Sequence, residues 1–165
     1  MRVAFIVPSR LAVGPNLFTA TLIRALRAHS GELRAETFFC NADGALTFDC
    51  PTFPVTRLVV DGAHRFDVVF STMLRPDLAL AYALRGVPRA LRVSIIHNFA
   101  DEDLAFQYAG DPLKIACCRA LWRAAMRRVG GVVVSSTHMA EYYRPRVRGD
   151  AVVALIPYGV PDPLA

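Results

Sequence analysis

Short apolar runs alternate with longer amphipathic stretches along this chain, and that alternation constrains the fold more than any other feature. The first run, Val3–Val7, is apolar at every position, as is typical of a strand covered on both faces. Strands that alternate with helices form right-handed crossovers and a parallel sheet. The pattern therefore predicts an α/β domain of three layers (α/β/α), Rossmann-like, with a mostly parallel sheet of about seven strands. The further strands are expected at residues 33–39, 55–60, 67–71, 89–96, 132–135 and 152–156.

Helices are expected between these strands. Asn16 is a favourable N-cap for a helix that continues to about Ser30. The longest helix is expected from about Pro112 to Arg128, and Ser136 is a good cap for a short helix that follows. We expect the core-facing side chains of the first helix to be Phe18, Leu22, Ala25 and Leu26, and those of the longest helix to be Leu113, Cys117, Leu121 and Ala124.

Length and composition indicate one folded domain. The 165 residues fit a single domain at 1–160, followed at 161–165 by the start of a linker or tail. Hydrophobic residues make up 54% of the chain and charged residues 20%, which excludes a disordered protein. No apolar stretch approaches the roughly 18 residues that a transmembrane helix needs. The cysteines are not spaced as CxxC, which favours reduced thiols in a cytoplasmic protein.

The loop after the first strand is the first candidate for ligand binding, because parallel α/β sheets bind ligands beyond the carboxyl ends of their strands. Gly14, Pro15 and Asn16 follow that strand. A dinucleotide fingerprint needs three glycines there, so an NAD-dependent enzyme is disfavoured. The N-terminus of the following helix can still offer N–H groups to a phosphate, or Gly14 and Pro15 can simply form a turn. Both interpretations remain open.

His97 is the strongest candidate for chemistry, since it lies where the fifth predicted strand ends. An imidazole there can donate a hydrogen bond to a sugar hydroxyl or act as a base, although a structural role is the alternative. His138, at the start of the short helix, is a second candidate. No two histidines have metal-ligand spacing, so no metal site is expected. The GxSxG motif of serine hydrolases is absent, and nucleophilic catalysis is not indicated.

Positive charge is concentrated in one block. The whole chain has 19 basic and 14 acidic residues, whereas residues 112–148 have 8 basic and 1 acidic. Arg119, Arg123 and Arg127 recur every fourth residue and form one stripe of the longest predicted helix. The stripe is either a solvated face or a contact with an anionic membrane surface. Nucleic acid is not expected, because aromatic residues do not alternate with the basic ones.

Several motifs, taken in order, resemble the N-terminal domain of GT-B glycosyltransferases, and in particular the family 4-like group. Together they cover residues 2–160, but two positions depart from the family pattern. Asn98 stands where relatives commonly have Asp, and Tyr158 stands where they commonly have Asn. The motifs are RVAFIV at 2–7, FDVV at 66–69, IIHN at 95–98, GVVVS at 131–135 and IPYGV at 156–160.

The resemblance implies one half of a two-domain enzyme. Such an enzyme moves a sugar from a nucleotide-sugar, here a UDP- or GDP-sugar, to a glycan or lipid-linked acceptor in cell-surface polysaccharide synthesis, without a metal. This half would bind the acceptor, and a separate C-terminal domain would bind most of the donor, so the chain is expected to be incomplete alone. His97 would be catalytic through contact with the transferred sugar. The substrate- and donor-binding residues would be Gly14, Pro15, Asn16, Ser71, Asn98, Ser135, His138, Tyr158 and Gly159.

Two alternatives accompany this interpretation. The same edge of the sheet could belong to a non-catalytic Rossmann-like module that binds a nucleotide or a partner protein. An apolar face left by a missing partner domain could also favour a homodimer. The second alternative is a peripheral membrane subunit, a cytoplasmic protein that the arginine stripe holds at the inner face of the membrane.

Overall fold

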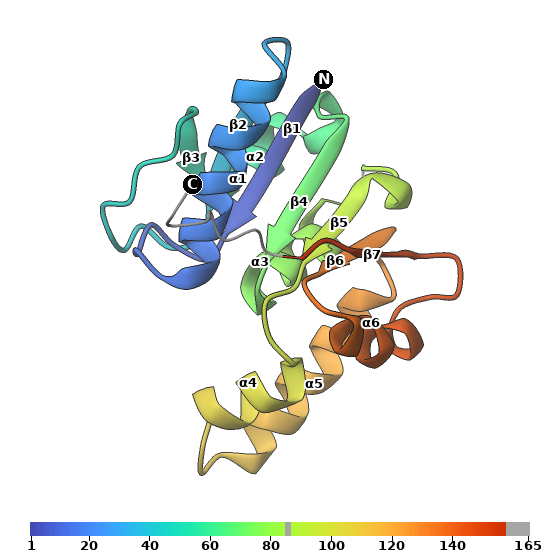
Figure 1. Ribbon diagram of the computed structural model, residues 1–165. Coiled ribbons are helices and arrows are strands. Elements are labelled where there is room, and N and C mark those ends of the chain that lie inside the picture. Colours follow the sequence, from blue (N-terminus) through green and yellow to red (C-terminus); the bar gives the residue numbers. More distant parts are fainter. Residues whose placement is uncertain (85–86, 158–165) are drawn as a thin grey trace, which may run out of the picture.

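Each strand of the central sheet runs parallel to its neighbours in the computed structural model, which describes residues 1–84 and 87–157. Within these residues the sheet has seven strands in the order β3-β2-β1-β4-β5-β6-β7 (Figure 1). The predicted fold class, with a parallel sheet of about seven strands, is confirmed. The strands are β1 Arg2–Val7, β2 Arg34–Phe39, β3 Thr52–Pro54, β4 Val68–Thr72, β5 Arg92–Ile95, β6 Gly131–Val134 and β7 Val152–Leu155.

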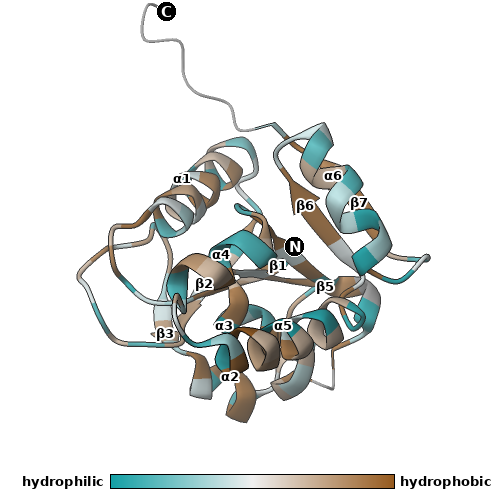
Figure 2. Cartoon of the chain, turned by 90° about the horizontal axis from the view of Figure 1, so that it is seen from below, coloured by the Kyte–Doolittle hydropathy of each residue, from teal (hydrophilic) through white to brown (hydrophobic). Residues whose placement is uncertain are grey.

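Helices cover both faces of the sheet, as Figure 2 shows for α1 on one side and α2, α3 and α5 on the other. Ile23 of α1 packs with alternate residues of β1, such as Phe5, in one core cluster. The opposite cluster joins Trp122 of α5 and Tyr143 of α6 to the other face of the sheet. The helices are α1 Gly14–His29, α2 Val55–Asp61, α3 Leu74–Leu78 with a π-helical continuation Ala79–Ala83, α4 Ala100–Gln107, α5 Pro112–Met126 and α6 Thr137–Tyr143. Short 3-10 turns lie at Ala63–Arg65, Arg89–Leu91 and Arg144–Arg146.

The strand predicted at residues 55–60 is wrong, because this segment is helix α2. Its β-branched residues favoured a strand, but only Leu58 is buried, while Val60 is 82% exposed. One buried position in seven residues matches the contact of a short helix with the core and does not match a strand covered on both faces. The third strand along the chain is instead β3, which has three residues, ends at Pro54 and forms one edge of the sheet. The strand predicted at 89–96 is also shorter than expected, since a 3-10 turn occupies Arg89–Leu91.

Asn16 lies inside the first turn of α1 and does not cap it, because the helix begins at Gly14 with Val13 at the N-cap. The Asn16 side chain is buried and donates hydrogen bonds to the carbonyl oxygens of Ser9 and Leu11, at 3.1 and 2.8 Å. These bonds close the loop onto the helix and set which face of α1 meets the sheet. The predicted face of α1 was therefore partly wrong. The buried residues of this helix are Asn16, Thr19 and Ile23, and Ala25 is exposed.

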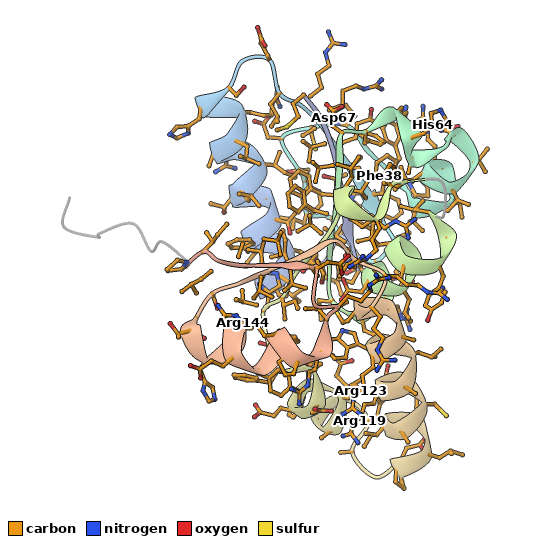
Figure 3. The ribbon with its side chains drawn as sticks, turned by 90° about the vertical axis from the view of Figure 1, so that its right-hand side faces the viewer. Phe38, His64, Asp67, Arg119, Arg123 and Arg144 are labelled. Atoms are coloured by element: carbon orange, nitrogen blue, oxygen red, sulfur yellow. The ribbon has the colours of Figure 1, made fainter. Side chains whose placement is uncertain are left out.

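The expected core face of α5 is also wrong. Leu113 and Leu121 are 74% and 50% exposed, whereas Trp122 is buried together with its neighbours toward the end of the helix. Both sides of α5 are apolar in sequence, so only the packing against α3 and α4 decides which one is covered. The first part of α5 extends with α4 away from the sheet, and Figure 3 shows Arg119 and Arg123 on this extension. By contrast, the predicted cap Ser136 is confirmed, since its hydroxyl accepts the N–H of Met139 at 3.2 Å.

Candidate functional site

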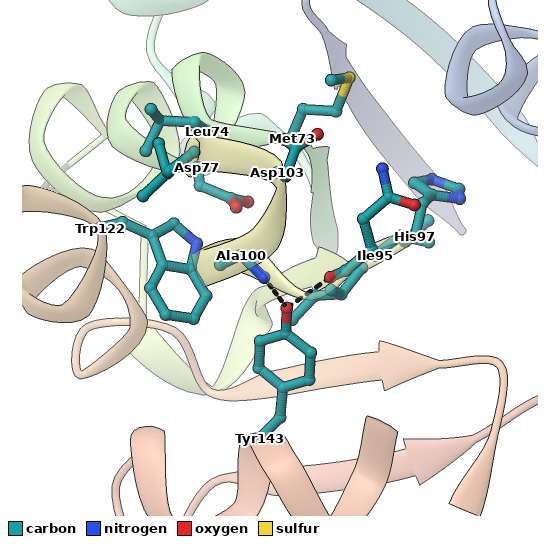
Figure 4. A pocket seen from close by; sticks show the side chains of 12 residues that line it. Met73, Leu74, Asp77, Ile95, His97, Ala100, Asp103, Trp122 and Tyr143 are labelled. Atoms are coloured by element: carbon teal, nitrogen blue, oxygen red, sulfur yellow. Dashed lines mark hydrogen bonds between the residues drawn. The ribbon is translucent and has the colours of Figure 1, made fainter. Parts of the chain in front are cut away.

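A small cavity of about 50 Å³ opens beyond the carboxyl end of β5 (Figure 4). Its walls come from the segments after β4 and β5 and from α4, α5 and α6. Most of the lining is apolar, and its polar side chains include those of Asp77, His97 and Tyr143. The edge beyond the carboxyl ends of the strands is where parallel α/β sheets bind their ligands. The remaining lining residues are Met73, Leu74, Ile95, Ile96, Asn98, Ala100, Asp103, Leu104 and Trp122.

Asp77 forms the buried polar wall of this cavity. One carboxylate oxygen accepts hydrogen bonds from the hydroxyls of Ser71 and Ser94, at 2.6 and 2.7 Å. These serines face each other in the register of β4 and β5, and the Trp122 side chain of α5 also bonds to the carboxylate. The residue is only 3% exposed, and burial raises the pKa of the Asp77 carboxyl to about 7. One acidic side chain thus ties two strands and two helices together beneath the cavity.

Tyr143 fixes the segment that carries the histidine. Its hydroxyl donates to the carbonyl oxygen of Asn98 at 2.5 Å and accepts the N–H of Ala100 at 3.0 Å, the two bonds drawn in Figure 4. The Tyr143 ring is fully buried and meets the Trp122 ring edge-to-face, with ring centroids 5.7 Å apart. Burial raises the pKa of the Tyr143 hydroxyl, so it stays protonated and can donate at any physiological pH. The loop between β5 and α4 is therefore anchored on both sides of its turn.

His97 is the second residue after β5 and is half-buried at the cavity wall. Its ring lies edge-on to Phe18 of α1, with ring centroids 5.2 Å apart. Burial lowers the pKa of the His97 imidazole to about 4, so the ring is neutral near pH 7. A neutral imidazole can donate one hydrogen bond and accept another. This state suits the recognition of a sugar hydroxyl better than proton transfer, because a general base needs a pKa near the working pH.

Met73 separates this cavity from a second, wider hollow of about 270 Å³. Its backbone has φ 75° and ψ 167°, a conformation that is almost restricted to glycine. Such strain occurs preferentially at ligand sites, where the surrounding structure maintains it. Both hollows share Met73 and Leu74, so they meet at the start of α3. The wider hollow is also lined by Pro8, Ser9, Leu11, Asn41, Asp43, Arg75, Gln107 and Tyr108.

The sequence of this domain also matches a known protein family. Residues 10–159 match the family model described as a glycosyl transferase 4-like domain. The chain belongs to this family. Its resemblance to family 4-like glycosyltransferases, inferred from motifs, is thereby confirmed.

Individual relatives agree with this assignment. Two curated Escherichia coli proteins, both described as O-antigen biosynthesis glycosyltransferase WclY, are each 26% identical to this domain over 150 residues. The match covers 87% of this chain and 41% of each relative, so the chain spans less than half of their length. Sucrose-phosphate synthase from Thermosynechococcus elongatus has the same fold, with a TM-score of 0.66 at 16% identity. That match covers 96% of this chain and 48% of the synthase.

The structure of this glycosyl transferase 4-like domain brings only some of the predicted site residues together. His97 and Asn98 line the cavity, and Ser71 lies at its base with its hydroxyl turned to Asp77. Ser135 bonds to the sulfur of Met139, 3.3 Å away. Tyr158 and Gly159 lie outside the described residues. Gly14 and Pro15 begin α1, Asn16 is buried behind them, and exposed His138 stands edge-on to the Phe99 ring.

Sequence reasoning missed the residues that shape the cavity of this glycosyl transferase 4-like domain, namely Met73, Asp77, Trp122 and Tyr143. Asp77 alone carried a signal, since it is an acidic residue next to an otherwise apolar helical stretch, 78–84. Among the described residues, no cluster of three His, Cys, Asp or Glu side chains could hold a metal ion. In the same part of the chain, no helix is long and apolar enough to cross a membrane.

Proposed function

We propose that this domain is the acceptor-binding half of a glycosyltransferase that moves a sugar from a nucleotide-sugar to a glycan or lipid-linked acceptor of cell-surface polysaccharide. The observation that carries the proposal is the cavity beyond β5, where a neutral His97 is presented on an anchored loop. Family membership supports the reaction type. The O-antigen relatives support the class of acceptor.

The chain's own residues would contribute mainly orientation. His97 would hydrogen-bond a hydroxyl of the transferred sugar, and its neutral ring would keep one donor and one acceptor in fixed directions. Tyr143 would act as a positioning residue, because it holds the backbone on the far side of His97. Exposed Asn98 at the cavity mouth would meet the substrate from outside. No step needs a metal in this scheme.

The donor would be bound mostly by a second domain. The comparison with curated relatives supports this, since the match covers only 41% of their length. The start of α1, at exposed Gly14 and half-buried Pro15, would approach the phosphates of a UDP- or GDP-sugar from this side. Ser135, after the end of β6, and His138, at the start of α6, would meet the donor at the same edge of the sheet. A cytoplasmic location remains a prediction.

Calorimetry tests whether binding of the nucleotide-sugar needs the second domain. The chain is titrated with UDP- and GDP-sugars, alone and with the donor-binding domain of the same protein family. We expect no measurable heat from the chain alone and binding once the second domain is present. Tight binding by the chain alone would contradict the proposal and would favour a self-sufficient nucleotide-binding module.

Substitution tests the role of His97 in the two-domain enzyme. We expect His97→Ala to lower kcat at least 100-fold, since a positioned hydrogen bond to the reacting sugar is lost. His97→Gln, which keeps a donor and an acceptor, should recover part of this loss. His29→Ala, at the exposed end of α1, is the matched control and should leave turnover unchanged. Near-normal turnover of His97→Ala would remove His97 from the site.

A further inference from the structure

The outer face of α5 is an apolar stripe that no part of the described chain covers. Leu113 and Leu121 are 74% and 50% exposed, and the alanine and cysteine residues on the same face are exposed too. Phe106, at the end of the neighbouring α4, is 86% exposed. Three large apolar side chains are therefore solvent-exposed on the hairpin that α4 and α5 form. The small exposed members of the stripe are Ala116, Cys117, Ala120 and Ala124.

Basic side chains border this stripe. At about 100° per residue, Arg123 lies along one edge of the apolar stripe and Lys114 along the other, while Arg127 and Arg128 follow the last residue of α5, Met126. All four residues are exposed, and α5 contains no acidic residue. Arg123 and Arg127 also line a surface hollow with Arg146.

The structure changes the arginine stripe expected from sequence. Arg119 does not share the free edge, because its Nε atom donates to a carboxylate oxygen of Asp101 on α4, 2.6 Å away. This ion pair instead joins the two helices of the hairpin. The outward face thus combines an apolar centre with basic borders and lacks the third arginine.

We propose that the outer face of α5 docks on an anionic lipid surface. The helix pattern is that of an interfacial segment, whose apolar centre enters the headgroup region while basic borders meet lipid phosphates. A second copy of the chain fits less well, because a symmetric contact would bring the basic residues of both α5 helices into one interface without an acidic partner on α5. A bilayer with anionic lipid satisfies both the apolar centre and the charge.

Docking in this way would bring the lipid surface close to the proposed site. The opposite side of α5 presents Trp122 to the cavity, so one helix diameter, roughly 10 Å, separates the stripe from the site. A lipid-linked acceptor would then reach the cavity from the membrane to which its lipid is anchored. This last step rests on the proposed function, whereas the docking itself does not.

Vesicle co-sedimentation tests the docking. The chain is mixed with phosphatidylcholine vesicles and with vesicles that also contain phosphatidylglycerol, without nucleotide. We expect binding to the anionic vesicles only, weakened at high salt. Arg123→Ala combined with Arg127→Ala should lower the partition coefficient about 30-fold, at about 5-fold for each basic residue near the surface. Leu113→Glu combined with Leu121→Glu should abolish binding.

Matched substitutions elsewhere keep the test specific. Arg24→Ala removes an exposed arginine from α1, and Val60→Glu places a charge on another exposed apolar position, in α2. Both should bind like the original chain, and circular dichroism should show that every variant is folded. Equal binding to neutral and anionic vesicles, or unchanged binding by the α5 variants, would overturn the proposal. A dimer that Leu121→Glu dissociates, with no vesicle binding, would assign the face to a second copy.

The outcome is separable from that of the proposed function. Vesicle binding is measured without turnover, and sugar transfer by the two-domain enzyme can be assayed with a detergent-solubilised acceptor that needs no membrane. Absence of sugar transfer by that enzyme, together with intact vesicle binding, would contradict the proposed function alone. Intact transfer without vesicle binding would contradict the docking alone.

Discussion

Asp77→Asn gives the sharpest test of the buried carboxyl beneath the cavity. The substitution keeps the size of the side chain and an oxygen that can accept from Ser71 and Ser94, but it removes the titration. In the folded protein the pKa of Asp77 is about 7, against an ordinary value of 3.8. Between these values the folded state binds the proton more tightly than the unfolded chain does. The contribution of Asp77 to stability is therefore complete below about pH 4 and is lost as the pH rises through 7.

The size of this effect follows from the two pKa values. A change from 3.8 to about 7 corresponds to about 4 kcal/mol of linked free energy for a group that is 3% exposed. His97 acts in the opposite direction, because its pKa is lowered from 6.5 to about 4 and its contribution is lost as the pH falls. The wild-type curve alone therefore mixes two opposing effects. The difference between wild type and Asp77→Asn isolates Asp77, since His97 is present in both.

Urea unfolding at pH 4 to 8 measures this difference, with the fluorescence of Trp122, the single tryptophan, as a local probe. We expect the free energy of unfolding of wild type, minus that of Asp77→Asn, to fall by about 4 kcal/mol between pH 4 and pH 7.5. Loss of the bond to the indole adds a constant offset only. Glu102→Gln, at an exposed carboxylate of α4, serves as control. A difference that does not change with pH would refute the reasoning.

Two further predictions concern the loops around the cavity. Tyr143→Phe should lower the free energy of unfolding by about 1–3 kcal/mol, because two backbone groups lose their partner, whereas Tyr108→Phe at the half-buried end of α4 should cost less. Denaturant titration measures both, and equal costs would contradict the anchoring role. Met73→Gly should be more stable than Met73→Ala by about 1 kcal/mol, because only glycine relieves the positive φ. Equal melting temperatures of the two variants would show that position 73 is not strained.

Local patterns in the sequence were sufficient to predict the class of fold. The fully apolar run of β1, the alternation of strands with helices and the cap at Ser136 each depend on neighbouring residues alone. The same patterns placed His97 at the end of β5, because the end of an apolar strand is a local feature. The order of the strands then presents that end at the ligand-binding edge.

Only the tertiary structure decided between conformations, or between helix faces, that the local sequence allows equally well. The segment at 55–60 could form a strand or a helix by propensity, and the tertiary structure realises the helix, with Leu58 as its one buried side chain. Helix α5 has two apolar sides, and packing against α3 and α4 buried Trp122 and left Leu121 exposed. Asp77 of α3 accepts a hydrogen bond from Ser94 of β5, 17 residues away in sequence, and bonds to Trp122 of α5. Such contacts join segments that are far apart in the chain, so no local periodicity or spacing could reveal them.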